Sequence, residues 1–284
     1  MKVNPLNDDL INGVIDIARQ AGFAIMEVYK TKFDIDTKED KRGDEIYRSP
    51  ITEADKRAHI IIMEGLKKLT PDIPLLSEEG QEISFEARSK WGVYWLVDPL
   101  DGTKEFVKKN DEFTVNIALL ENKQPVFGVV YAPALNKLYF GSSEKGSFKS
   151  NEGDTFTPIS VNAQVTNPVQ IAVSRSHPSL KMNSFISQFD KYDLHPMGSS
   201  LKICSVSDGT VHFYPRLGPT MEWDTAASHA IIRAAGGELI NCGTNKPLEY
   251  NKENLLNPKF IAGFVKNIQS LKQSFMIEGN IDSV

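Results

Sequence analysis

The run Trp95–Thr103 constrains this chain more than any other stretch of its sequence. An apolar, β-rich segment leads directly into two carboxylates, Asp98 and Asp101, which would repel each other unless protonated or bridged by cations. Pro99 fixes its backbone φ and Gly102 permits a tight turn, so we expect the backbone to hold both carboxylates in place. Mg²⁺ prefers rigid oxygen ligands and often binds through a few carboxylates together with a substrate phosphate. The run therefore predicts a magnesium site for phosphate-ester chemistry.

Length and charge narrow the class of protein. The chain has 284 residues, enough for one large domain or two packed ones. Its formal net charge of -5 disfavours nucleic acid or an anionic membrane as the main partner. Cys204 and Cys242 are expected to be free thiols in a reducing cytosol. The N-terminus lacks an apolar secretory core and no apolar run reaches roughly 18 residues, which predicts a cytoplasmic enzyme without an integral membrane segment.

The first half of the chain predicts two helices followed by a sheet. Apolar residues recur with a helical period over 6–29 and 52–69, and Thr52 with Asp55 resembles a capping box at the second helix start. Strands are expected in close succession, largely antiparallel, at 73–76, 94–97, 113–120, 126–131 and 137–141. This arrangement is typical of an α+β layer.

The second half changes to an α/β rhythm. Strands are expected at 169–173 and 211–214, and helices at 180–189, 201–207 and 224–235. The polar stretch 159–167 lies between the two patterns. We therefore expect an α+β metal-binding domain over 1–160 and an α/β substrate-selecting domain over 161–284.

Four acidic elements stand at the end of a predicted strand or the start of a predicted helix, where function collects in layered α/β proteins. They are Asp55, the pair Glu78-Glu79, the pair Asp98/Asp101, and Asp224. Taken singly, Asp55 could cap its helix, Glu78-Glu79 could form a solvated turn, and Asp224 could be favoured by the helix dipole. The pair Asp98/Asp101 follows a segment expected to be buried, so these carboxylates need partners.

These elements carry a resemblance to a known family. Asp55, Glu78-Glu79, the run 98–103 and Trp223–Ala227 match in order and spacing the signature of the inositol monophosphatase superfamily, which comprises lithium-sensitive, magnesium-dependent phosphatases. The similarity extends over nearly the whole chain and is greatest to the 3′(2′),5′-bisphosphate nucleotidases. Supporting segments are 113–118, 174–177, 198–202 and 214–216. The resemblance implies a layered α/β/α/β/α sandwich of the inositol monophosphatase/fructose bisphosphatase type.

The resemblance also implies a set of metal ligands. Glu78, Asp98 and the Leu100 carbonyl would hold one Mg²⁺, with Glu79 nearby through water. Asp98, Asp101 and Asp224 would hold a second, and a third ion is left open. Two such ions can clamp both sides of an in-line displacement.

Catalytic and substrate residues follow from the same resemblance. Asp55 and the Thr103 hydroxyl would orient and deprotonate the attacking water. The backbone N–H groups of Gly102 and Thr103 would face the scissile phosphate. The nucleotide pocket would be lined by His177, Ser199, Lys202 and Arg216. Without the resemblance, a lysine on a helix is usually a solvated cation, and a lone histidine is usually structural.

The expected reaction is hydrolysis of the 3′-phosphate of adenosine 3′,5′-bisphosphate to AMP and phosphate, in sulfur assimilation. An inositol monophosphatase or sugar bisphosphatase is the alternative, because it would share the metals without needing a cationic pocket. A non-catalytic metal or nucleotide sensor is disfavoured, since Asp55 and Thr103 are both present. We expect a monomer acting on a small-molecule nucleotide, in the cytoplasm or peripherally at the inner face of the cell membrane.

Overall fold

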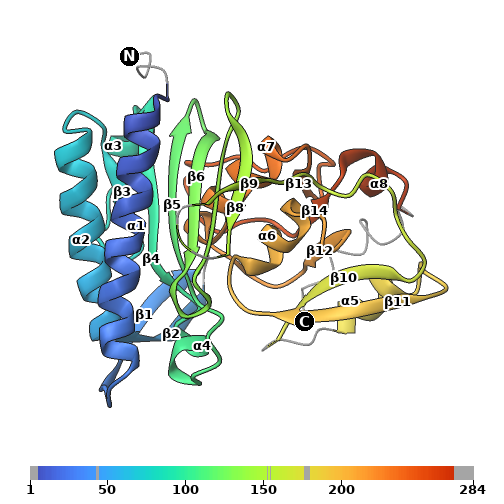
Figure 1. Ribbon diagram of the computed structural model, residues 1–284, viewed down its shortest axis with the longest axis horizontal. Helices are drawn as coiled ribbons and strands as arrows, with labels where there is room; N and C mark the ends of the chain where they lie inside the picture. Colours follow the sequence, from blue (N-terminus) through green and yellow to red (C-terminus); the bar gives the residue numbers. More distant parts are fainter. Residues whose placement is uncertain (1–5, 43–44, 152, 154, 176–179, 272–284) are drawn as a thin grey trace.

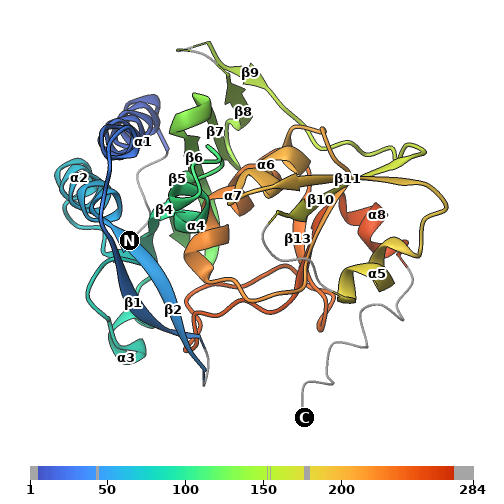
Figure 2. The same ribbon diagram turned by 90° about the horizontal axis from the view of Figure 1, so that it is seen from below.

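The computed structural model describes residues 6–42, 45–151, 153, 155–175 and 180–271, with only the backbone for 38–50, 180 and 181. Two sheets alternate with three helical layers (Figures 1 and 2). Helices α1 (Asp8–Tyr29) and α2 (Glu53–Leu69) cover the outer face of the first sheet. Helices α6 (Leu201–Ser207) and α7 (Glu222–Ala234) lie between the sheets, and α5 (Leu180–Ile186) and α8 (Val265–Gln269) cover the second sheet. The expected α/β/α/β/α sandwich is confirmed.

The first sheet has seven strands in chain order and is antiparallel except for its first pair. The largely antiparallel pairing was predicted, whereas the last two strands were not. The strands are β3 (Leu75–Ser77), β4 (Val93–Asp101), β5 (Thr114–Glu121), β6 (Gln124–Ala132), β7 (Lys137–Ser142), β8 (Gly146–Ser150) and β9 (Thr157–Pro158). Short helical turns α3 (Phe85–Arg88), α4 (Thr103–Val107) and η1 (Pro133–Leu135) interrupt the connections. Thr52 caps α2 and Asp55 completes the predicted capping box.

The hairpin of β1 (Ile35–Arg42) and β2 (Glu45–Thr52) was not predicted. The sequence of β1 is mostly charged and lacks the apolar alternation that marks a half-buried strand. The hairpin lies at one end of α2 and leads into its N-terminus (Figure 2). Thr52 ends β2, and Asp55 lies in the first turn of α2. The hairpin therefore leads into the end of α2 that faces the site described below.

The second sheet has the strand order β11-β10-β12-β14-β13. Its strands are β10 (Val169–Ser174), β11 (Tyr192–Met197), β12 (Phe213–Arg216), β13 (Glu238–Asn241) and β14 (Phe260–Gly263). Strand β10 is parallel to β11 and β12, whereas β14 is antiparallel to β12 and β13. The second half is thus a mixed sheet with helices on both faces.

Helix α7 packs unusually close to the first sheet. A Cβ at Gly128 on β6 would collide with the backbone of Ala227, and one at Gly141 on β7 would lie 2.8 Å from the Ile231 Cα. Because glycine has no side chain at these two positions, α7 can approach the strands closely. The close packing places the first turn of α7, which carries Asp224, beside the end of β4.

The structure also bears on the predictions for the cysteines, for membrane-spanning segments and for the domain boundary. Both cysteines are free, with Cys204 buried and Cys242 partly buried. Among the helices described, none combines the length and apolar character needed to cross a bilayer. Residues 159–168 connect the two sheets, but a division into domains 1–160 and 161–284 stays a prediction.

Candidate active site

A cavity of about 170 Å³ lies where β4 ends and α6 and α7 begin. Polar and charged side chains from both halves of the chain surround it. Predicted site residues in its lining are Glu78, Asp98, Leu100, Asp101, Gly102, Thr103, Ser199, Lys202, Arg216 and Asp224. The fold thus brings together acids and cations that are up to 146 positions apart in sequence, from Glu78 to Asp224.

A bulge in β4 aims Asp98 and Asp101 into the same cavity. Residues three apart in a regular strand point to opposite faces. Here Asp98 pairs with Asn116 and Asp101 with Thr114, so β4 advances three residues while β5 advances two. The extra residue realigns the strand and puts both carboxylates on the face toward α7. The rigid turn expected at this position is therefore a β-bulge, followed by Gly102 with φ 91° at the start of α4.

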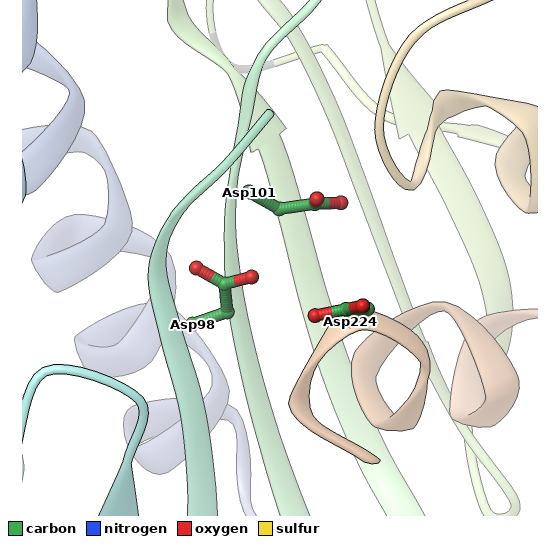
Figure 3. Close-up of side chains that lie close together, drawn as sticks. All are labelled: Asp98, Asp101 and Asp224. Carbon is green, nitrogen blue, oxygen red and sulfur yellow. The ribbon is translucent and has the colours of Figure 1, made fainter. Parts of the chain in front are cut away.

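Asp98, Asp101 and Asp224 form an acidic cluster, with carboxylate oxygens within 4.8 Å of one another. Figure 3 shows the three side chains converging, the first two from the strand and the third from the start of α7. The Asp224 carboxylate is oriented by the Met221 N–H, which donates to Oδ2 at 2.9 Å. Like charges this close need protons or a cation between them.

Glu78 brings a fourth carboxylate to the cluster. The parallel pairing of β3 with β4 ends at Ser77 opposite Val97, and the Glu78 N–H donates to the Val97 carbonyl at 3.1 Å. Burial raises the pKa of Asp98 well above its usual value, and the nearby charges of Glu78, Asp101 and Asp224 raise it further. Four carboxylates thus converge on one site, where their mutual repulsion opposes full ionisation in the absence of a cation. Such a set of hard oxygen donors fits a divalent cation.

Two serines and two strand residues hold Asp101, and the sequence reasoning assigned none of them this role. Ser199 and Ser200 donate to Asp101 Oδ2 at 2.5 and 3.2 Å, and Asn116 Nδ2 donates to Ser200 Oγ at 3.0 Å. The Thr114 hydroxyl lies 2.5 Å from Ser199 Oγ. Thr114 and Asn116 are buried polar residues in a strand that is otherwise mostly apolar. Because buried polar groups need hydrogen-bond partners, this pattern was the sequence signal that could have identified them.

Ser200 also joins the two sides of the acidic cluster, because its hydroxyl lies 2.8 Å from the Asp224 backbone carbonyl as well as against Asp101. Ser199 has φ 49°, so the turn before α6 adopts a left-handed conformation to present these hydroxyls. The expected role of Ser199 toward a nucleotide stays a prediction.

Asp55 lies behind the cavity wall and contacts it through Thr103. The Thr103 hydroxyl donates to Asp55 Oδ1 at 3.3 Å and lies 3.4 Å from the Leu100 carbonyl. The other oxygen of Asp55 accepts from the Thr52 N–H and hydroxyl, each at 2.7 Å. Asp55 is 2% exposed. The structure confirms the capping contact of Asp55, and its catalytic role stays a prediction.

Lys202 and Arg216 bring positive charge to the opposite wall. Lys202 Nζ donates to the Ser199 and Met197 carbonyls at 2.6 and 3.4 Å, which leaves a third N–H for a ligand. Burial, reinforced by the Arg216 charge, lowers the pKa of Lys202 to about 8. Arg216 donates from Nη2 to the Pro219 carbonyl at 2.6 Å, and its Nε is buried without a partner among the described residues.

Two predicted residues are not placed at the cavity. Glu79 follows Glu78 in the turn after β3 and does not line the cavity, so its contact through water stays a prediction. His177 lies outside the described residues.

Comparisons with known proteins agree with this arrangement. The model of the inositol monophosphatase family matches residues 6–273. The 3′(2′),5′-bisphosphate nucleotidase CysQ of Escherichia coli strain K12 is 45% identical over 254 residues, which cover 88% of this chain and 98% of that protein. The protein of the same name from Haemophilus influenzae is 36% identical over 90% of this chain and 93% of its own length.

Among solved structures, CysQ from Bacteroides thetaiotaomicron superposes with a TM-score of 0.79 at 40% identity, covering 92% of this chain and 99% of that one. That CysQ is a bacterial member of the inositol monophosphatase family. An IMPase from Thermotoga maritima shares the fold with a TM-score of 0.75 at 24% identity, over 95% of this chain and 98% of that one. The family match spans nearly the whole sequence, and the chain belongs to the inositol monophosphatase family.

Proposed function

We propose that this chain is a magnesium-dependent 3′(2′),5′-bisphosphate nucleotidase that hydrolyses the 3′-phosphate of adenosine 3′,5′-bisphosphate to AMP and phosphate. One observation carries the proposal: a single cavity has an acidic cluster on one wall and Lys202 with Arg216 on the other. The first suits a phosphate ester activated by cations, and the second suits an additional phosphate of the same molecule. The names of the CysQ relatives support this substrate class.

The acidic cluster would hold the metal. Asp98, Asp101 and Asp224 would share two Mg²⁺ ions, with Glu78 and the Leu100 carbonyl as further ligands, and a third ion remains open. When bound, such ions lower the pKa of an attacking water and neutralise charge on the leaving oxygen. The serines around Asp101 and the Met221 N–H on Asp224 would keep both carboxylates oriented before any ion arrives.

Asp55 and Thr103 would handle the proton of the attacking water. Because the Thr103 hydroxyl donates to Asp55, its oxygen keeps a lone pair that can accept from a water in the cavity. As the water attacks phosphorus, its proton would pass to Thr103 Oγ1 while the threonine proton passes to Asp55 Oδ1. Asp55 is buried and held by Thr52, so the acceptor is in place without rearrangement.

The cationic wall would select the nucleotide. With a net charge of -5 the chain as a whole repels a bisphosphate, so local cations must supply the attraction. Lys202 and Arg216 would bind the 5′-phosphate, and the Gly102 and Thr103 N–H groups would face the scissile 3′-phosphate. His177 stays a proposed contact of the nucleotide.

The substrate assignment has a direct test. With Mg²⁺ present, phosphate release from adenosine 3′,5′-bisphosphate should exceed release from inositol 1-phosphate or a sugar bisphosphate, compared as kcat/KM. Faster turnover of the inositol ester would assign the chain to the inositol monophosphatases instead. A protein that binds the nucleotide in Mg²⁺ without turning it over would revive the sensor alternative.

The charge on Lys202 should appear in the pH profile. Its pKa of about 8 means that the ammonium is present below this pH and is lost above it. We expect kcat/KM for adenosine 3′,5′-bisphosphate to fall above about pH 8, because this parameter reports the free enzyme. Lys202→Arg should remove this limb, since a guanidinium stays charged. An unchanged alkaline limb in that variant would contradict the assignment to Lys202.

A cytoplasmic location and a monomeric state complete the proposal. Both rest on composition and resemblance. Sedimentation of the purified protein would test the second.

A further inference from the structure

A chain of buried polar groups runs from the second sheet to the start of α7. His229 on α7 is fully buried; its Nδ1 lies 2.8 Å from the Tyr250 hydroxyl, and its Nε2 contacts the Glu238 carboxylate on β13. The Tyr250 hydroxyl in turn lies 3.2 Å from Thr225 Oγ1. Thr225 lines the cavity and directly follows Asp224.

The available protons determine which group donates in each hydrogen bond of His229. A carboxylate can only accept, so His229 carries its proton on Nε2 and donates to Glu238. Nδ1 must then accept from the Tyr250 hydroxyl, whose oxygen can accept from Thr225 Oγ1; the same threonine hydroxyl also lies 3.2 Å from the Glu222 carbonyl. The Leu239 N–H donates to Glu238 at 3.0 Å and Arg233 lies 3.6 Å from it, so the carboxylate is kept charged. Burial lowers the pKa of His229, which agrees with a neutral imidazole.

Neighbouring polar groups also hold the first turn of α7. Asn257 Nδ2 donates to the Met221 carbonyl at 2.8 Å and to Thr225 Oγ1 at 3.0 Å. The Asn251 N–H, one residue after Tyr250, donates to the buried Glu222 carboxylate at 2.7 Å. The turn Met221–Thr225 is thus attached to β13 and to the segment 250–257 by directional bonds. Asp224 belongs to that turn, so the same bonds restrain its backbone.

We propose that Glu238, His229 and Tyr250 are positioning residues that fix the first turn of α7 and thereby hold Asp224 in register with Asp98 and Asp101. This rests on the proposed function of the acidic cluster as a cation site. An apolar filling of this space would stabilise the interface equally well. Hydrogen bonds, in contrast, orient the groups that they join. Groups behind the ligands of a metal ion tune its affinity in this way.

Tyr250→Phe tests the proposal, because it removes one oxygen and keeps the buried ring. We expect the dissociation constant for Mg²⁺, measured by titration calorimetry without substrate, to rise about tenfold. The Mg²⁺ concentration giving half-maximal activity should rise in parallel, while the KM for the nucleotide at saturating Mg²⁺ stays near the wild-type value. His229→Gln should move Mg²⁺ binding in the same direction.

Tyr139→Phe is the matched control. Its hydroxyl is also largely buried and lies 3.4 Å from Asp208, but neither residue lines the cavity. It should leave Mg²⁺ binding unchanged. Wild-type Mg²⁺ affinity in Tyr250→Phe, with or without a lower melting temperature, would overturn the positioning role alone. A wild-type protein that binds no Mg²⁺ would instead overturn the proposed function and this inference with it.

Discussion

Replacing Asp98 with Asn should cost kcat on the order of 10³-fold, because a shared metal ligand is worth several kcal/mol in the transition state. Asp98 is 1% exposed and is the residue whose pKa the neighbouring carboxylates raise. The measurement is kcat for phosphate release at saturating nucleotide and Mg²⁺. Asp72→Asn, at an exposed position after α2, should leave activity unchanged. Near-normal turnover of Asp98→Asn would refute the ligand assignment.

The same substitution should stabilise the metal-free protein. An acid whose pKa is raised on folding stabilises the protein only below its unfolded value, 3.8, and costs stability as pH rises toward the folded value. At neutral pH without divalent cations, folding therefore opposes the ionisation of Asp98 in the wild type, and this cost is absent from the Asn variant. Urea unfolding in a chelator should show the variant to be the more stable protein. Added Mg²⁺ should reverse the order, since it stabilises the wild type by binding the folded state.

Replacing Thr103 with Val should lower kcat by roughly 10²–10⁴-fold while leaving Mg²⁺ binding and nucleotide KM close to normal. Valine keeps the shape of threonine and removes only the hydroxyl that joins Asp55 to the cavity. The two parameters are read from nucleotide saturation curves, with Mg²⁺ binding measured separately. Loss of Mg²⁺ affinity together with kcat would instead place Thr103 among the metal-holding groups.

Thr103→Val is a cleaner test of the Asp55–Thr103 pair than a change at Asp55. Asp55→Asn would also disturb the capping box of α2 and cost about 1 kcal/mol of stability. Thr31→Val serves as the control, because it removes a hydroxyl that donates to the Val28 carbonyl at the end of α1, at 2.9 Å. It should leave kcat unchanged.

The sequence predicts the elements with strong apolar periodicity and misses those without it. Helices α1 and α2 and strands β4 to β7 repeat apolar residues at their characteristic spacing, and all were predicted within a few residues. The charged hairpin β1–β2, the edge strand β11 with its exposed residues and an internal proline, and the four-residue strands β13 and β14 lack such a pattern. Their pairing depends on tertiary contacts that no local window contains.

The site divides in the same way. The acids were predictable because each ends a strand or begins a helix, and the resemblance linked them. The hydrogen bonds that orient them were not, since Ser199 meets Asp101 across 98 positions. The series of hydrogen bonds from Glu238 to Thr225 could not be predicted either, because in the sequence buried His and Tyr residues look like ordinary core residues.

The extra residue in β4 allows one strand to face two environments that a regular strand of this sequence would mix. On this strand Val97 and Leu100 face the core beneath α1 and α2, while Asp98 and Asp101 face α7. In a regular strand with the same sequence, Asp101 would point away from Asp98 and into that apolar layer, because the two residues are three positions apart. A local irregularity of the backbone therefore puts two charges on one side of a strand whose other side stays hydrophobic.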